Sequence, residues 1–232
     1  MQAGVGSNNA AMLNTDDAIR ARRSVRGFRP EPVPDELMQR VFDLAQCAPS
    51  NCNTQPWVVH VASGAVRDHL RLRLLQAAAD PAQHRPDFPY DGRYDGVFRA
   101  RQLDAAVQLY GVMGIARDDK AGRAASYRRN FELFDAPHVA FLFIPGAFGL
   151  REAADIGMYA QTLMLALTAH GLASCPQTSL SFFPRVVREV LGVDAGHKLL
   201  FGLAFGYEDP GVAANACRVG RAALSETVAF HR

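Results

Sequence analysis

Apolar residues recur along this chain at helical and at strand spacing, a pattern that predicts an α+β fold. Apolar faces at helical spacing predict a short helix from Thr15 that closes in the run Arg22–Arg26, followed by helices at Asp35–Ala48, Ala65–Ala78, Arg151–His170 and Pro184–Leu191. Short apolar runs predict strands at Trp57–Ala62, Val139–Ile144 and Leu199–Phe205. A stretch rich in proline and glycine, Asp80–Gly96, predicts an irregular loop that leads into another helix.

The predicted helix Arg151–His170 is apolar on nearly every face, and Gly171 provides a typical stop signal. Such a helix has to be covered all round. It therefore either runs through the centre of the domain or packs against a second subunit. Gln161, Thr162 and His170 interrupt its apolar run, so we do not expect it to span a membrane.

Composition narrows the possible functions. The 232 residues have a formal net charge of +2 with basic and acidic residues interspersed, so nucleic-acid binding is not expected. The four cysteines follow no C-x-x-C or disulfide pattern, which favours a cytoplasmic location. The seven histidines lack metal-site spacing, so we expect no metal ion.

The chain shows no composition break that would divide it into several domains. We expect a flexible arm at residues 1–14 and a single domain at residues 15–232. The first residues have neither the positive segment nor the apolar core of a secretory signal.

A polar segment stands immediately before the first predicted strand. It contains Pro49, Ser50, Asn51, Asn53 and Gln55. Prolines at both ends restrict the backbone, so the hydroxyl and amide side chains can be aimed at a planar ligand with several donors and acceptors. A turn that caps a helix has the same composition, and from this segment alone the two interpretations remain open.

Two basic clusters stand near opposite ends of the chain. The first holds Arg22, Arg23, Ser24 and Arg26, and the second holds Arg218 and Arg221. Guanidinium groups with a nearby hydroxyl are typical of a phosphate clamp. Alternatively, the first cluster only complements the negative end of its helix. Distant clusters can converge on one phosphate, which favours the clamp.

Motifs for other chemistry are missing. The sequence contains no G-x-S-x-G elbow, no Walker A loop and no G-x-G-x-x-G turn. Cys52 and Cys175 have no base beside them in the sequence, so we do not expect a catalytic thiol. Any redox chemistry would therefore come from a bound cofactor.

The chain resembles the FMN-dependent nitroreductase family. The resemblance rests on R-R-S-x-R at residues 22–26, on A-P-S-x-x-N-x-Q-P-W at residues 48–57 and on an arginine near the C-terminus, and it spans nearly the whole chain. It implies a nitroreductase-like fold with a central, mostly antiparallel sheet flanked by helices. It also implies a domain-swapped type of homodimer with FMN bound between the subunits.

The resemblance assigns candidate contacts to the FMN phosphate and the flavin edge. Arg22, Ser24 and Arg221 would hold the phosphate, with Arg218 as a helper and Arg23 in the same cluster. Arg26 would lie near the pyrimidine edge, where a positive charge stabilises reduced flavin and raises its potential.

Further contacts implied by the resemblance come from other parts of the chain. Ser50, Asn53 and Gln55, with Pro49 and Asn51 in the same loop, would reach the ribityl chain or the ring from the opposite subunit. The segment 171–176 would form a turn against the ring. Along one ring edge would lie Pro176, Gln177 and Thr178, with a backbone N–H donating to N5, and Gln161 is a further candidate. The segment Glu226–Phe230 would add a strand to the partner's sheet.

The implied activity is that of an NAD(P)H-dependent oxidoreductase with a ping-pong mechanism. NADH or NADPH would reduce the flavin, and a nitroaromatic, quinone or similar electrophile would then oxidise it. No catalytic side chain is required, since solvent can supply protons. Alternatives are a reductase of the same fold acting on enones or halophenols, and an FMN-binding protein without turnover.

Two positions depart from the family pattern. Many relatives have K-x-R at the C-terminal phosphate site, whereas Val219 precedes Gly220 and Arg221 here. Gln177 and Thr178 replace an apolar residue and an acid, which makes the space over the flavin less negative.

Overall fold

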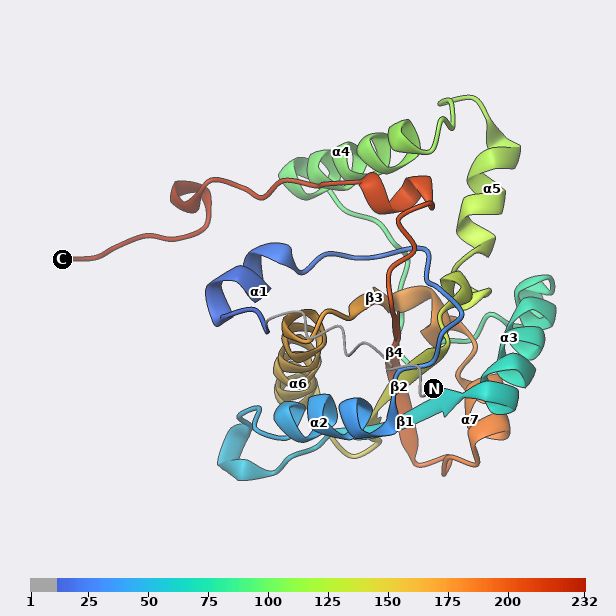
Figure 1. Ribbon diagram of the computed structural model, residues 1–232, viewed down its shortest axis with the longest axis vertical. Helices are drawn as coiled ribbons and strands as arrows, with labels where there is room; N and C mark the ends of the chain where they lie inside the picture. The colour runs from blue at the N-terminus through green and yellow to red at the C-terminus, as the bar shows by residue number, and fades with distance from the viewer. Residues whose placement is uncertain (1–11) are drawn as a thin grey trace, which may run out of the picture.

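The computed structural model describes residues 12–232, and its centre is a four-stranded antiparallel sheet (Figure 1). The strand order is β1-β2-β4-β3, formed by β1 (Val58–Ser63), β2 (His138–Pro145), β3 (Ala173–Gln177) and β4 (His197–Gly206). The helices are α1 (Thr15–Ala21), α2 (Asp35–Ala45), α3 (Gly64–Ala78), α4 (Gly96–Val112), α5 (Lys120–Arg128), α6 (Leu150–Ala169) and α7 (Pro184–Leu191). The order of helices and strands is that of an α+β fold.

Strand β2 is buried on both faces, and its alternating side chains reach two different cores. Ala140, Leu142 and Ile144 belong to the core under α2 and α6. Val139, Phe141 and Phe143 belong to the core under α3 and α7. Because successive side chains of a strand point to opposite faces, this sheet separates two helical layers, which Figure 1 shows on either side of it.

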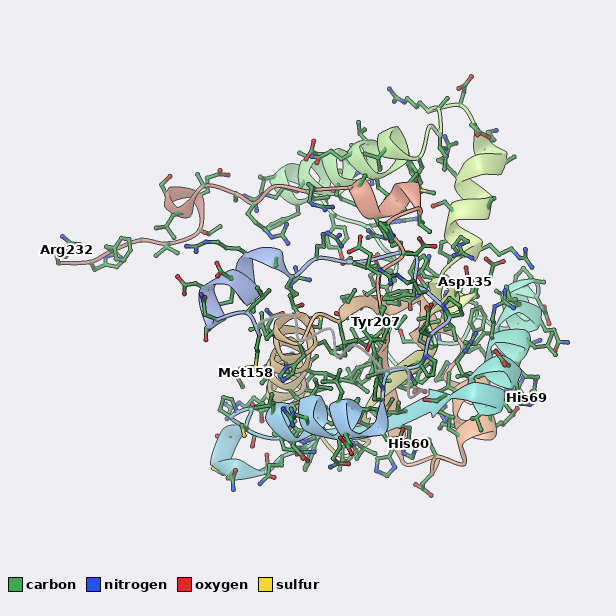
Figure 2. All side chains as sticks on the ribbon, in the orientation of Figure 1. His60, His69, Asp135, Met158, Tyr207 and Arg232 are labelled. Atoms are coloured by element: carbon green, nitrogen blue, oxygen red, sulfur yellow. The ribbon has the colours of Figure 1, made fainter. Side chains whose placement is uncertain are left out.

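Helix α6 is buried on only one side in the single chain. Ile156, Tyr159 and Leu163 face the core at helical spacing, while Gly157 and Met158 are exposed. Figure 2 shows Met158 on the flank of α6 that faces away from the sheet. From the sequence, either the centre of the domain or a second subunit was expected to cover this helix. Within one chain, the centre of the domain covers only one side of it.

The predicted elements agree with the structure to within a few residues, with three differences. The helix predicted at Asp35–Ala48 ends at Ala45, because residues 46 and 47 form a turn. The predicted turn at 171–176 is wrong beyond Gly171, since β3 begins at Ala173 and pairs with β4. Pro176 is tolerated there because β3 lies at the edge of the sheet. Helix α5 was not predicted.

Residues 12–14 and the segment after β4 lie outside the sheet. The expected arm at residues 1–14 falls almost entirely outside the described residues, but Leu13 donates a backbone hydrogen bond to Ala169 and Asn14 caps α1. After β4 the chain passes between α1 and α4 and runs away from the body to Arg232 (Figures 1 and 2). Residues 227–232 form no strand within the chain. Their pairing with a second copy stays a prediction.

Candidate functional site

The segment after α1 is extended, and this explains the spacing of its arginines. Ser24 forms a parallel bridge with Ser174, and Val25 N donates to Ser174 O at 3.0 Å. In an extended segment alternate side chains share a side. Val25 is buried and Arg23 is held by both carboxylate oxygens of Glu208. The side chains at positions 22, 24 and 26 are left to act together.

Cys175 lies beside this group, and its thiol is not activated. Burial raises the pKa of Cys175 to about 11, although Arg26, Ser24 and Arg22 act in the opposite direction. The thiol is therefore protonated at neutral pH, and a thiolate nucleophile is not available there. Cys175 packs instead with Val25 in a small apolar cluster.

The C-terminal arginines face the same cavity as Arg22, Ser24 and Arg26. The cavity has a volume of about 1100 Å³. Its walls include the segment 22–26, Gln161 and Thr168 of α6, the turn before β3, and residues 217–221. Both Arg218 and Arg221 line it. The two basic clusters, far apart in the sequence, therefore converge as predicted.

The cavity carries more positive than negative charge, since Glu208 is the acid among its lining residues and six arginines line it. Burial and the nearby Arg221 lower the pKa of the Arg22 guanidinium. Arg218 and Arg221 donate to backbone carbonyls of their own segment. Among the described residues, the ion pairs of cavity-lining residues are that of Arg23 with Glu208 and that of the exposed Arg20 with Asp16; Arg22, Arg26, Arg218 and Arg221 have no acidic partner. Uncompensated guanidinium groups around one cavity fit a bound phosphate.

The polar segment at residues 49–55, which we call the amide loop, lies elsewhere in the chain. Its backbone is anchored where Asn51 N donates to the buried Asp155 carboxylate at 3.1 Å, near the start of α6. Gln161 and Thr168 line the cavity further along the same helix. Asp155 and Thr168 are about 20 Å apart along the helix axis at 1.5 Å rise per residue. None of the loop residues Pro49, Ser50, Asn51, Asn53 and Gln55 lines the cavity of its own chain.

The amide loop has a strained, well-connected backbone. Cys52, Asn53 and Gln55 have φ angles of 50°, 56° and 47°, a region that non-glycine residues rarely adopt. Ser50 Oγ accepts from Gln55 N at 2.9 Å, which ties the two ends of the loop together. The side chains of Asn53 and Gln55 are left exposed, so they are available to another molecule.

Pro176, Gln177 and Thr178, the predicted contacts to the ring edge, do not line the cavity. Of β3, only Ala173 belongs to the cavity wall. Pro176 and Thr178 are exposed. Gln177 is buried, and its Nε2 donates to Asn130 O at 2.9 Å, so its side chain points into the protein. Only the backbone of Gln177 is left for the predicted contact.

Three residues that shape the site were not predicted. Glu208 neutralises Arg23, Asp155 anchors the amide loop, and Asn215 bonds to the segment 26–27. An acid three residues after a predicted strand and an asparagine just before the C-terminal arginines were the available signals. Neither signal names its partner, because each pairs with a residue far away in the sequence.

Comparison with known proteins agrees with this geometry. Residues 19–207 match the model of the nitroreductase family. The chain belongs to the nitroreductase family. Nitroreductase NfnB of Mycolicibacterium smegmatis is 50% identical over 92% of this chain and 91% of its own length. A 4-nitrobenzoate reductase of Pseudomonas putida is 35% identical over 90% of this chain and 93% of its own.

Solved nitroreductase structures share the fold. The FMN-dependent nitroreductase NfnB from Mycobacterium smegmatis, solved in complex with NADPH, superimposes with a TM-score of 0.90, covering 94% of this chain and 97% of that one. An FMN and NADPH-dependent nitroreductase NfnB from Sphigopyxis sp. strain HMH gives 0.91 at 35% identity, covering 95% of this chain and 100% of that one. The nitroreductase-like fold expected from the sequence is confirmed. No helix within residues 12–232 has the length and apolar character needed to cross a membrane.

Proposed function

We propose that this chain is an FMN-dependent oxidoreductase that uses NAD(P)H to reduce nitroaromatic compounds. The observation that carries the proposal is the convergence of two arginine segments on one cavity without acidic partners for Arg22, Arg26, Arg218 and Arg221. The relatives named as nitroreductases are 50% and 35% identical over nearly the whole chain and support the same activity. Their structures are named as FMN-dependent and NADPH-dependent, and we propose NADPH as the donor.

The residues of the cavity would bind and orient the cofactor. Arg22, Arg218 and Arg221 would hold the phosphate by charge-assisted hydrogen bonds, with Ser24 adding a hydroxyl donor. Arg26, in the same extended segment, would place a positive charge towards the flavin ring. When bound, FMN supplies hydride transfer between the nicotinamide and the electrophile. This chemistry requires no titrating side chain from the protein, because solvent can supply the protons.

We infer that the working unit is a homodimer. The amide loop and the arginine cavity lie at different ends of α6, so one chain does not bring them together. The exposed flank of α6 would pack against a second copy, which would place the loop of one chain at the cavity of the other.

We also propose a reducing, cytoplasmic location. The four cysteines are free thiols, which supports it.

The proposal is tested by anaerobic spectroscopy of the purified protein. We expect flavin absorbance that bleaches on addition of NADPH and recovers when a nitroarene such as 4-nitrobenzoate is admitted. Bleaching without recovery would exclude nitroarenes as acceptors. A protein that stays colourless in the presence of added FMN would contradict the proposal as a whole.

A further inference from the structure

Asn215 is a buried amide that joins the two arginine segments of the cavity. It belongs to the short turn η5 (Ala213–Ala216) and is 3% exposed. Its Oδ1 accepts from Arg26 N at 2.7 Å, and its Nδ2 donates to Gly27 O at 2.9 Å and to Asp209 O at 2.8 Å. One side chain thus holds the N-terminal segment against the loop that follows β4.

The backbone of Asn215 connects this contact to the C-terminal arginines. The Arg218 guanidinium donates to Asn215 O at 2.7 Å. The residue therefore bonds on one side to the segment that carries Arg26 and on the other side to an arginine of the second segment. The amide of Asn215 does not titrate, and because it is buried, water does not compete for its hydrogen bonds.

Close packing fixes the same contact sterically. A Cβ atom at Gly27 would lie 2.5 Å from Cβ of Val212, the residue immediately before η5. Two atoms at that distance clash, so the segments approach as closely as a glycine permits. The spacing of the two arginine segments is therefore set by Asn215 and by the contact of Gly27 with Val212.

We propose that Asn215 is a positioning residue for the cofactor phosphate, because it sets the distance between the N-terminal and C-terminal arginines. This inference rests on the proposed function. Asn215 does not line the cavity and acts through the backbone of Arg26 and through Arg218. It also lies beyond residues 19–207, the part that matches the family model.

A comparison of FMN with riboflavin tests this role, since riboflavin lacks only the phosphate. In Asn215→Ala we expect the FMN dissociation constant to rise about tenfold, in line with the loss of buried hydrogen bonds worth about 1.4 kcal/mol in total. The riboflavin dissociation constant should change less than about twofold. Fluorescence titration of the apo-protein measures both constants without any turnover.

A second variant separates the two segments while leaving Asn215 in place. Gly27→Ala introduces the clash with Val212 and should also weaken FMN but not riboflavin. The double variant Gly27→Ala with Val212→Gly removes the clashing side chain and should recover FMN affinity. This pair decides the question even if Asn215→Ala does not fold.

Asp87→Asn is the matched control for a general loss of stability. The Asp87 carboxylate accepts from Arg188 and from Leu199 N, at the opposite end of β4 from the cavity. It should leave the ratio of FMN to riboflavin affinity unchanged. Equal loss of both flavins in Asn215→Ala and Gly27→Ala, or unchanged FMN affinity in both, would overturn the positioning role. A wild-type protein that binds neither flavin would instead contradict the proposed function.

Discussion

His138 is a buried hydrogen-bonding centre between three elements. It is 3% exposed at the start of β2, and its Nε2 accepts from Val33 N at 2.9 Å. Because Val33 N–H is a donor, Nε2 carries no proton, and Nδ1–H donates to Ser63 Oγ at 2.6 Å. The core therefore uses the neutral imidazole. Burial and the charge of Arg67 lower the pKa of His138, while Asp35 opposes them.

This arrangement predicts that the protein loses stability in mild acid. Above pH 6.5 the histidine is neutral in both the folded and the unfolded chain, so its full contribution is present. As the pH falls below 6.5, the unfolded chain binds a proton that the folded chain excludes. We expect the free energy of unfolding to fall by up to about 1.4 kcal/mol per pH unit until the lower folded pKa is reached. Urea unfolding at several pH values measures this slope.

Two variants test whether His138 causes this dependence of the free energy of unfolding on pH. His138→Gln keeps an acceptor for Val33 N and does not titrate, so it should flatten the pH dependence. The pKa of His60 is also lowered, by burial and by His197, so His60→Gln should remove only the part of the slope that His60 causes. An undiminished slope in His138→Gln would show that another group takes up the proton.

At the scale of elements, α6 organises the site more than any other helix. Its first turns hold the amide loop through Asp155, and its later turns line the arginine cavity through Gln161. The apolar pattern of its sequence predicted the helix and its burial. The same pattern gave no sign of Asp155 as an anchor, because a lone acid among apolar residues does not reveal which distant N–H it accepts from.

Removing the loop anchor should weaken flavin binding without discriminating between flavins. Asp155→Ala deletes a charge-assisted hydrogen bond worth about 1.5 to 3 kcal/mol and releases a loop with three strained φ angles. Since the loop is proposed to contact the ribityl chain or the ring, FMN and riboflavin affinities should fall together by roughly tenfold or more. Fluorescence titration measures the affinities, and faster amide exchange at residues 51–55 should accompany the loss.

The exposed Asp43 provides the control for this variant. Within residues 12–232 its carboxylate accepts only from Gln39, on the surface of α2. Asp43→Ala should leave both flavin affinities and amide exchange in the loop unchanged. Loss of FMN affinity alone in Asp155→Ala would place the loop at the phosphate and contradict its assignment to the ring.

At the scale of the whole molecule, large apolar side chains are exposed on α6, on α4 and in the C-terminal tail. Met158 on α6 is 40% exposed, Val107 on α4 is 69% exposed and Phe230 in the tail is 69% exposed. None of the residues of α4 is buried. Large exposed apolar surfaces mark interaction sites, and a second copy of the chain is the partner proposed above.

A charge on the α6 flank should therefore separate the subunits and release flavin at the same time. Met158→Arg would bury an unpaired charge in the proposed interface, which costs several kcal/mol. Size-exclusion chromatography with light scattering should show a monomer, and the protein should elute without its yellow colour. Val66 on α3 is 48% exposed on another side of the molecule, so Val66→Arg should stay dimeric and yellow. A yellow Met158→Arg monomer would mean that one chain suffices for the cofactor.

The sequence predicted local structure well and long-range assembly only in part. Periodicity located five of the helices and three of the strands to within a few residues, because each depends on its own apolar pattern, and the loop at residues 80–96 indicated where α4 begins. Strand β3 was missed since it contains Ser174, Pro176 and Gln177 and owes its conformation to pairing with β4. The convergence of Arg22 with Arg221 was predicted, but the residues that enforce it were not, because hydrogen bonds between distant segments leave no periodic signal.

The union of two distant segments in one cavity also orders events during biosynthesis. A ribosome delivers Arg22 and Arg26 long before Arg218 and Arg221. At translation rates of 5 to 20 residues per second, the interval is roughly ten to forty seconds. Until the C-terminal arginines are made, the nascent chain has only the N-terminal half of the proposed phosphate site. We therefore expect cofactor loading to follow the synthesis of the proposed C-terminal contacts, and a polypeptide interrupted before Asn215 to remain an empty apoprotein.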